Sequence, residues 1–160
     1  MLEREIVEKL ENMKSLHILE VSVPRTRRIF VRADKEYFKD VIQFLKNEGF
    51  MHLSAITGLE TNDVIELLYH LSKEGILLTV QVKLPLNEIT APTITDIIPG
   101  ALLYEREIHD LFGVKFEGHP NLAPLILPDD WPKDVYPLRK SGATKEGKLK
   151  KKQKHSRTNI

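Results

Sequence analysis

Cysteine is absent from the 160-residue sequence. The chain therefore cannot form a disulfide bond, a thiolate nucleophile, a cysteine-ligated zinc site or an ordinary iron–sulfur cluster. Lack of cysteine suits a reducing compartment without proving one. Functions that require any of these groups within this chain are excluded at the outset.

Long apolar runs are missing as well. No run approaches the roughly 20 apolar residues that a membrane-spanning helix requires. The chain begins MLEREIVEKLENMK, a charged amphipathic pattern without the apolar stretch of a secretory signal. We therefore expect any connection to a membrane to be made through a partner.

Common catalytic motifs are not found either. The chain has no glycine-rich phosphate loop, no GxSxG nucleophile motif and no HExxH metal motif. The six histidines are scattered over different predicted elements: His17, His52, His70, His109, His119 and His155. The sequence thus provides no recognisable metal or nucleotide site.

Charge is distributed unevenly along the chain. Residues 139–160 contain nine basic residues and one acidic residue, a charge of +8. Since the whole chain carries only +1, the preceding 138 residues carry −7. An acidic folded part and a basic tail are therefore expected. The tail could bind nucleic acid, anionic lipid or an acidic protein groove, or it could act only as a solubilising segment.

Hydrophobic periodicity predicts a helix, a β-hairpin, a second helix and a three-stranded meander, in that order. The predicted helices span residues 2–13 and 34–48, and the predicted strands span 16–23, 27–33, 51–59, 64–72 and 76–84. Asp34 is expected to cap the second helix and Gly49 to end it. This order predicts an α+β fold, a two-layer sandwich of helices on one face of a mostly antiparallel sheet.

The remaining sequence divides into three segments. They follow the predicted α+β domain, which spans residues 1–86. The first segment, residues 87–118, is a linker with at most a short helical turn, followed by a helix at 101–112 that packs on the domain. Gly113 is explained as the glycine that ends this helix. Residues 119–140 contain five prolines, which favour an extended docking arm. Residues 141–160 are expected to be disordered unless bound.

The densest motif is YEREIHDLFGVKFEGHP, residues 104–120. Charged neighbours four residues apart on the predicted helix would stabilise it by only about 0.2–0.5 kcal/mol per exposed pair. Two interpretations stay open: a solvated helix face, or a face that meets oppositely charged groups elsewhere. An acid/base site of Glu105, Glu107 and His109 is disfavoured because residues two apart on a helix point to different sides. For His119, we expect a hydrogen bond to backbone rather than a catalytic role.

Much of this motif resembles the signature of the C-subunit family of NADH-quinone oxidoreductase, or respiratory complex I. The matching positions are Glu105, Arg106, Glu107, Asp110, Phe112, Gly113, Phe116, Gly118, His119, Pro120 and Leu122. Tyr136–Lys140 is similar to the family's closing His-Pro-Leu-Arg-Lys segment. Stretches around residues 69–71, 92–95 and 99–101 also match in type and spacing, so the likeness covers nearly the whole chain to Lys140.

Three departures from the complex I pattern indicate a particular branch of the family. Tyr136 stands where complex I members usually have histidine, and Ala123–Pro124 replaces a usual pair of arginines. Residues 128–135 lack the family's Gly-Phe-Glu-Gly run. These departures favour the membrane-bound energy-converting nickel–iron (NiFe) hydrogenases and related archaeal ion-pumping complexes.

The resemblance implies a non-catalytic hydrophilic subunit without its own cofactor. Its partners would be a large NiFe-hydrogenase-like subunit and a small iron–sulfur subunit, which would hold the iron–sulfur clusters and, in a hydrogenase, the NiFe centre. It would be peripheral, at the cytoplasmic face of the cell membrane, with only indirect contact to the membrane arm. The implied partner interface comprises Glu105, Arg106, Glu107, Asp110, Phe112, Gly113, Phe116, Gly118, His119, Pro120, Leu122, Tyr136, Pro137, Leu138, Arg139 and Lys140.

Two other functions are kept as alternatives. The first is a small nucleic-acid-binding module that uses the basic tail, although the tail has no interleaved aromatic residues for base stacking. No nucleic-acid partner is expected on the main hypothesis. The second is a free-standing hydrolase or isomerase that uses Glu107 and His109.

Overall fold

The computed structural model describes residues 2–140 of the chain. Its helices are α1 (Leu2–Asn12), α2 (Phe38–Asn47) and α3 (Ala101–Phe112), with a short 3-10 turn at Lys14–Leu16. The strands are β1 (Ile18–Arg25), β2 (Arg28–Ala33), β3 (His52–Thr61), β4 (Val64–Lys73), β5 (Ile76–Pro85), β6 (Thr90–Pro92) and β7 (Lys115–Glu117). No helix in this described part of the chain is long and apolar enough to cross a membrane.

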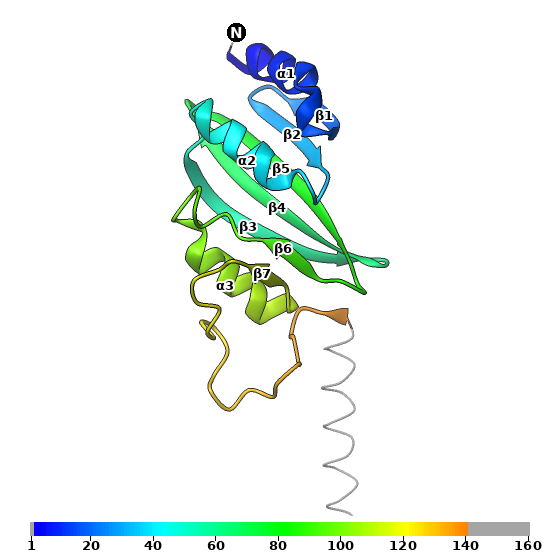
Figure 1. The fold of residues 1–160 in the computed structure, drawn as a ribbon, viewed down its shortest axis with the longest axis vertical. Coiled ribbons are helices and arrows are strands. Elements are labelled where there is room, and N and C mark those ends of the chain that lie inside the picture. The colour runs from blue at the N-terminus through cyan, green and yellow to red at the C-terminus, as the bar shows by residue number, and fades with distance from the viewer. Residues whose placement is uncertain (1, 141–160) are drawn as a thin grey trace, which may run out of the picture.

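The main sheet has five strands in the order β1-β2-β5-β4-β3 (Figure 1). The predicted hairpin and meander are confirmed, since β1 pairs antiparallel with β2, and β4 pairs antiparallel with both β3 and β5. However, β2 and β5 pair in parallel, so the sheet is mixed. The parallel pairing of β2 with β5 was not predicted. Short turns indicate which consecutive strands are neighbours, but they do not indicate how the hairpin and the meander pair with each other.

The hydrophobic core lies between the sheet and its helices. Along β4, residues alternate between buried and half-buried, and the buried set is Ile65, Leu67, Tyr69 and Leu71. Helix α2 covers this face, with the rings of Phe38 and Tyr69 4.6 Å apart. The buried positions of α2 are Phe38, Val41, Ile42 and Leu45, which recur at helical spacing.

Helix α3 packs on the same face of the sheet, beside strand β3. Gly58 of β3 pairs with the buried Leu67 of β4 and therefore faces the core. A Cβ atom on Gly58 would lie 2.7 Å from the ring of Phe112 on α3. Glycine at position 58 is thus what lets α3 approach the sheet closely.

Two predicted boundaries are wrong. Asp34 does not cap α2, because its side chain and carbonyl instead close a turn with the N–H groups of Glu36 and Tyr37, each at 3.1 Å. The helix begins only at Phe38. Likewise β1 begins at Ile18, since the preceding residues form the 3-10 turn. The end of α2 is as predicted: Gly49 has φ of 98°, and Phe50 N–H donates to Leu45 O at 2.9 Å.

The linker contains a structure that the sequence did not predict. Strand β6 pairs in parallel with β7, which follows α3, with Thr90 opposite Lys115 and Ala91 opposite Phe116. This small second sheet joins the segments that enter and leave the helix. It therefore holds both ends of α3 in place against the domain.

Candidate partner-docking site

Glu105 is the most buried charged residue of the signature motif, with 0% of its surface exposed. Its carboxylate accepts hydrogen bonds from Thr93 Oγ1 at 2.6 Å and from Ile94 N–H at 2.8 Å. Burial raises the pKa of Glu105 to about 7, against the opposing effect of these two donors. Glu105 therefore ties the segment before α3 to the helix and does not reach any outside group.

His119 makes backbone contacts, as predicted. Its Nε2 lies 3.0 Å from Leu102 O, and its Nδ1 accepts from Asn121 N–H at 3.0 Å. Because Nδ1 is an acceptor, the ring carries its proton on Nε2 and donates it to Leu102. Glu105 Oε2 is 3.9 Å from Nε2, and both side chains are fully buried. These two groups therefore cannot act on an external substrate.

Arg106 and Asp110 hold the proline-rich segment against α3. The Arg106 guanidinium donates to the carbonyls of Ala123 and Pro124, both at 2.9 Å. One carboxylate oxygen of Asp110 accepts three successive backbone N–H groups, at 2.8, 2.8 and 3.3 Å, from Leu125, Ile126 and Leu127. Arg106 thus supplies donors for the carbonyl groups of this irregular backbone, and Asp110 supplies an acceptor for its N–H groups.

The interpretation of α3 as a solvated charged face is wrong for Glu105 and Asp110. Glu105 and Asp110 are both buried, and their partners lie outside the helix. The neighbours four residues apart bond elsewhere instead of to each other, with His109 Nδ1 2.7 Å from Val114 O. The oppositely polarised groups that α3 meets in this structure belong to its own chain.

The closing segment 136–140 returns to the end of α3 and to strand β3. Gly113 ends the helix with φ of 76°, and a Cβ there would lie 2.5 Å from the Tyr136 ring. Leu138 N–H donates to Leu111 O at 3.0 Å. Glu60 Oε2 accepts Lys140 N–H at 2.7 Å and lies 3.4 Å from Arg139 Nε. We name residues 119–140 the arm; it is anchored at both ends.

The anchored arm leaves apolar side chains exposed. Leu125 is 41% and Ile126 is 52% exposed, directly beside the backbone that Asp110 holds. We call these two residues the arm ridge. Leu138 is also exposed, at 54%. Apolar side chains held in contact with water do not stabilise the monomer. This surface is therefore a candidate contact for another protein.

The other residues of the implied interface divide between core and surface. Phe112 and Phe116 are buried in the hydrophobic core, and Leu122 packs against it. Gly118 has φ of 84°, and Pro120 is exposed. The buried members can therefore shape the arm. The exposed surface comprises Pro120 and Leu138 from the sequence-based set together with the arm ridge, which is absent from that set. Its exposure could not be read from the sequence, since Leu125 and Ile126 carry no motif.

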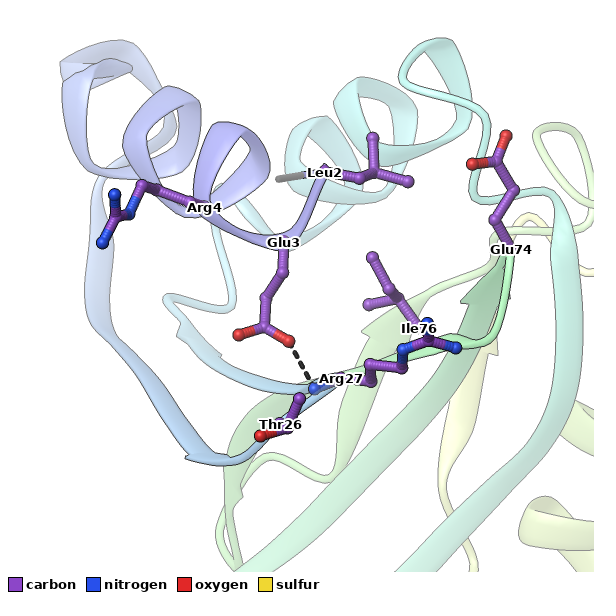
Figure 2. A pocket seen from close by; sticks show the side chains of 7 residues that line it. All are labelled: Leu2, Glu3, Arg4, Thr26, Arg27, Glu74 and Ile76. Carbon is purple, nitrogen blue, oxygen red and sulfur yellow. Dashed lines mark hydrogen bonds between the residues drawn. The ribbon is translucent and has the colours of Figure 1, made fainter.

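A hollow of about 520 Å³ lies at the end of the molecule that carries the N-terminus, away from the arm (Figures 1 and 2). It lies beside the start of α1 and the β1–β2 turn, where the Glu3 carboxylate accepts the backbone N–H of Arg27. Two acidic and two basic residues line it and balance in charge: Glu3, Glu74, Arg4 and Arg27.

Among residues 2–140, no group of three or more potential metal ligands is present.

The fold and site define a class of protein: a small α+β domain whose charged helix anchors a proline-rich arm. A family model described as "Respiratory-chain NADH dehydrogenase, 30 Kd subunit" matches residues 31–148. The chain belongs to this family, which confirms the resemblance found in the sequence.

Relatives come from several kinds of complex. The chain is 32% identical over 142 residues to the C subunit of the F(420)H(2) dehydrogenase of Methanosarcina mazei, covering 86% of this chain and 89% of that protein. It is 32% identical over 118 residues to the beta subunit of the membrane-bound hydrogenase of Pyrococcus furiosus, covering 70% and 68%. A polypeptide of the archaeal membrane-bound sulfane sulfur reductase superposes with a TM-score of 0.80 at 32% identity, covering 94% and 92%.

Proposed function

We propose that this chain is a non-catalytic hydrophilic subunit of a membrane-associated oxidoreductase complex related to complex I. Its similarity to subunits of an F(420)H(2) dehydrogenase, a membrane-bound hydrogenase and a sulfane sulfur reductase supports this class of complex. Within it, the chain docks on the large NiFe-hydrogenase-like subunit, near the small iron–sulfur subunit. It supports electron transfer coupled to ion translocation without carrying electrons itself.

The observation that carries this proposal is the anchoring of an exposed apolar ridge. Arg106 and Asp110 together make five hydrogen bonds to backbone groups of residues 123–127. The ridge of Leu125 and Ile126 is therefore ordered before any partner arrives. Preordering reduces the conformational entropy lost on association, so a small surface can contribute more to affinity.

The chain's composition is consistent with a role beside the redox centres. With no cysteine, it cannot ligate an iron–sulfur cluster, so the clusters and any NiFe centre would belong to partner subunits. A peripheral position at the cytoplasmic face of the membrane, reached through those partners, follows from the same proposal.

The arm ridge can be tested by replacing its two apolar side chains. We expect Leu125→Ser with Ile126→Ser to leave the melting temperature of the isolated chain nearly unchanged, because both side chains are exposed. The same variant should lose at least about tenfold in recovery of the large subunit when purified through an affinity tag from its own cells, the loss that roughly 1.4 kcal/mol of binding energy produces.

Met51→Ser is the matched control, since Met51 is 63% exposed and lies outside the arm. It should co-purify the large subunit as the unmodified chain does. Full recovery with the ridge variant would refute docking through the arm ridge.

Nucleic-acid binding remains the alternative function, and it depends on the basic segment 141–160, which lies outside the described residues. Such binding would weaken steeply with salt and would vanish when this segment is removed. Absence of measurable binding at low salt would dismiss it. A hydrolase using Glu107 and His109 would require turnover by the isolated chain, and we expect none.

A further inference from the structure

The arm and the last turns of α3 line an open-mouthed pocket of about 340 Å³. We call it the arm pocket. It is lined by His109, Asp110, Pro124, Leu127, Pro128, Asp129, Trp131, Pro132, Lys133, Asp134, Val135 and Tyr136. Within the loop, Trp131 Nε1–H donates to Val135 O at 2.7 Å and Trp131 N–H to Pro128 O at 3.0 Å. The first bond fixes the edge of the Trp131 ring against the loop, and the second holds the backbone that carries the ring.

The walls of the arm pocket are aromatic and stiff. Trp131 and Tyr136 are half-buried, and three prolines limit how far the surrounding loop can collapse. Tyr136 is itself seated over Gly113, where no other residue would leave room for its ring. The arm pocket that these residues line is therefore a built feature of the arm and not a gap in a loose loop.

The rim of the arm pocket is acidic. Asp129 and Asp134 are exposed, and Lys133 is the one basic residue of the lining that opposes them. Asp110 adds a third carboxylate at the base, although its contacts to three N–H groups partly compensate its charge. Burial and the charge of Asp134 both raise the pKa of Tyr136, and the charge of Arg139 opposes them. His109 lines the base with its Nδ1 already bonded to Val114.

Aromatic walls under an acidic rim match one kind of side chain. We propose that the arm pocket receives the side chain of an arginine from a partner subunit. This inference rests on the proposed function, since it gives the docking arm a specific contact. A planar guanidinium stacks on the faces of tryptophan and tyrosine while its five N–H donors reach carboxylates. Lysine offers a compact charge but no plane to stack.

The chain contains its own reporter for this site. Trp131 is the single tryptophan of the sequence, so tryptophan fluorescence reports on the arm pocket alone. The full-length chain is titrated with N-acetyl-arginine-amide, and with the citrulline and lysine analogues. We expect a saturable change with the arginine compound in the millimolar range, since a single residue lacks the rest of the partner's surface. The neutral, isosteric citrulline analogue should bind at least about tenfold more weakly, as should lysine.

The decisive variant is Asp129→Asn with Asp134→Asn, which keeps Trp131 and the size of the rim residues. Affinity for the arginine compound should fall at least about tenfold. Rising salt should reduce the difference in affinity between the unmodified chain and this variant. Asp40→Asn with Asp63→Asn removes the same charge from exposed positions outside the arm pocket and should leave the titration unchanged. Equal melting temperatures of the two double variants would show that neither change acts through folding.

Three results would overturn the assignment. The first is that the citrulline or lysine analogue binds with the same affinity as the arginine compound, and the second is that the Asp129 and Asp134 variant gives an unchanged titration. The third is that the arginine compound binds only to a variant in which Lys150→Gln, Lys151→Gln and Lys152→Gln are combined. The last would mean that the chain's own basic segment occupies the pocket. Because the titration needs no partner, it can fail while the arm ridge still proves necessary for co-purification. Failure of the inference is therefore distinguishable from failure of the proposed function.

Discussion

Glu105 combines complete burial with a titratable group at the centre of the signature motif. The ionisable groups around it come from several elements: His119, 3.9 Å away, Tyr69 on β4, and Asp96 and Lys39 farther off. Within residues 2–140, the buried Tyr69 hydroxyl has no hydrogen-bond partner, and its own pKa is raised by burial and by the charge of Glu105. An ionised Glu105 is thus poorly compensated, and a protonated one is favoured.

This arrangement predicts a specific dependence of stability on pH. The folded-state pKa of Glu105, about 7, exceeds the ordinary value of 4.5, so the folded chain binds the proton more tightly than the unfolded chain. The stabilisation is complete below pH 4.5 and is lost as pH rises through about 7. Its full size is on the order of 3 kcal/mol. Glu105→Gln should therefore gain stability relative to the unmodified chain across this window, as measured by urea unfolding at each pH.

Glu107→Gln is the matched control, because Glu107 lies two residues away and is half-exposed. Its unfolding free energy should follow the unmodified chain at every pH. If the difference between Glu105→Gln and the unmodified chain is constant from pH 4.5 to about pH 8, the proposed role of Glu105 as a buried, proton-binding anchor is wrong.

At the scale of elements, α3 acts as the support for the arm. The helix contributes Arg106 to the carbonyls and Asp110 to the N–H groups of one five-residue stretch. Peptide groups of irregular structure must find partners when they are partly removed from water. Without these two side chains, the stretch 123–127 would have to open toward solvent.

Asp110→Ala should release this stretch without unfolding the domain. The amides of Leu125, Ile126 and Leu127 would lose their acceptor, so their hydrogen exchange should accelerate at least about tenfold, which corresponds to roughly 1.4 kcal/mol. Amides of the central strand β5 should exchange as before. Asp129→Ala is the control within the arm, since these three amides donate to Asp110 and not to Asp129. Unchanged protection in Asp110→Ala would show that Asp110 does not order the arm.

Elements with local periodicity were predictable, whereas those that depend on distant partners were not. The meander and α3 follow from alternation, polar turns and flanking glycines within a few residues. The β6–β7 pair joins two three-residue strands on either side of α3, and one of them ends in Pro92. Such short strands leave no alternation to detect, and their pairing is decided by where α3 packs.

The candidate site divides in the same way. The motif 104–120 could be predicted from the sequence as a candidate interface, but the contacts that its residues make lie far along the chain. Glu105 bonds to the linker at Thr93, and Arg139 lies beside Glu60 on β3. Nothing in the local sequence around Glu60 indicates that contact. The sequence therefore predicted a set of candidate interface residues, and only the structure separated the buried anchors from the exposed surface.

At the scale of the whole molecule, the hydrophobic core and the arm occupy different parts of the fold. The sheet and the helices α1, α2 and α3 enclose the hydrophobic core, and the arm extends from α3 at the end opposite the N-terminus (Figure 1). Every helix and strand of residues 2–140 precedes residue 118. The arm can therefore be removed without interrupting the sheet.

Deleting Pro120–Lys140 tests this division directly. We expect a folded monomer with unchanged far-ultraviolet circular dichroism and a melting temperature lowered by several degrees, because Gly113 and the end of α3 lose the cover of Tyr136. The deleted chain should no longer co-purify the large subunit from its own cells. Deleting Ser141–Ile160 removes a segment of nearly equal length and should leave co-purification intact. If the chain without its arm still recovers the large subunit fully, the partner must bind the sheet or α1 instead, and the arm is only a brace for α3.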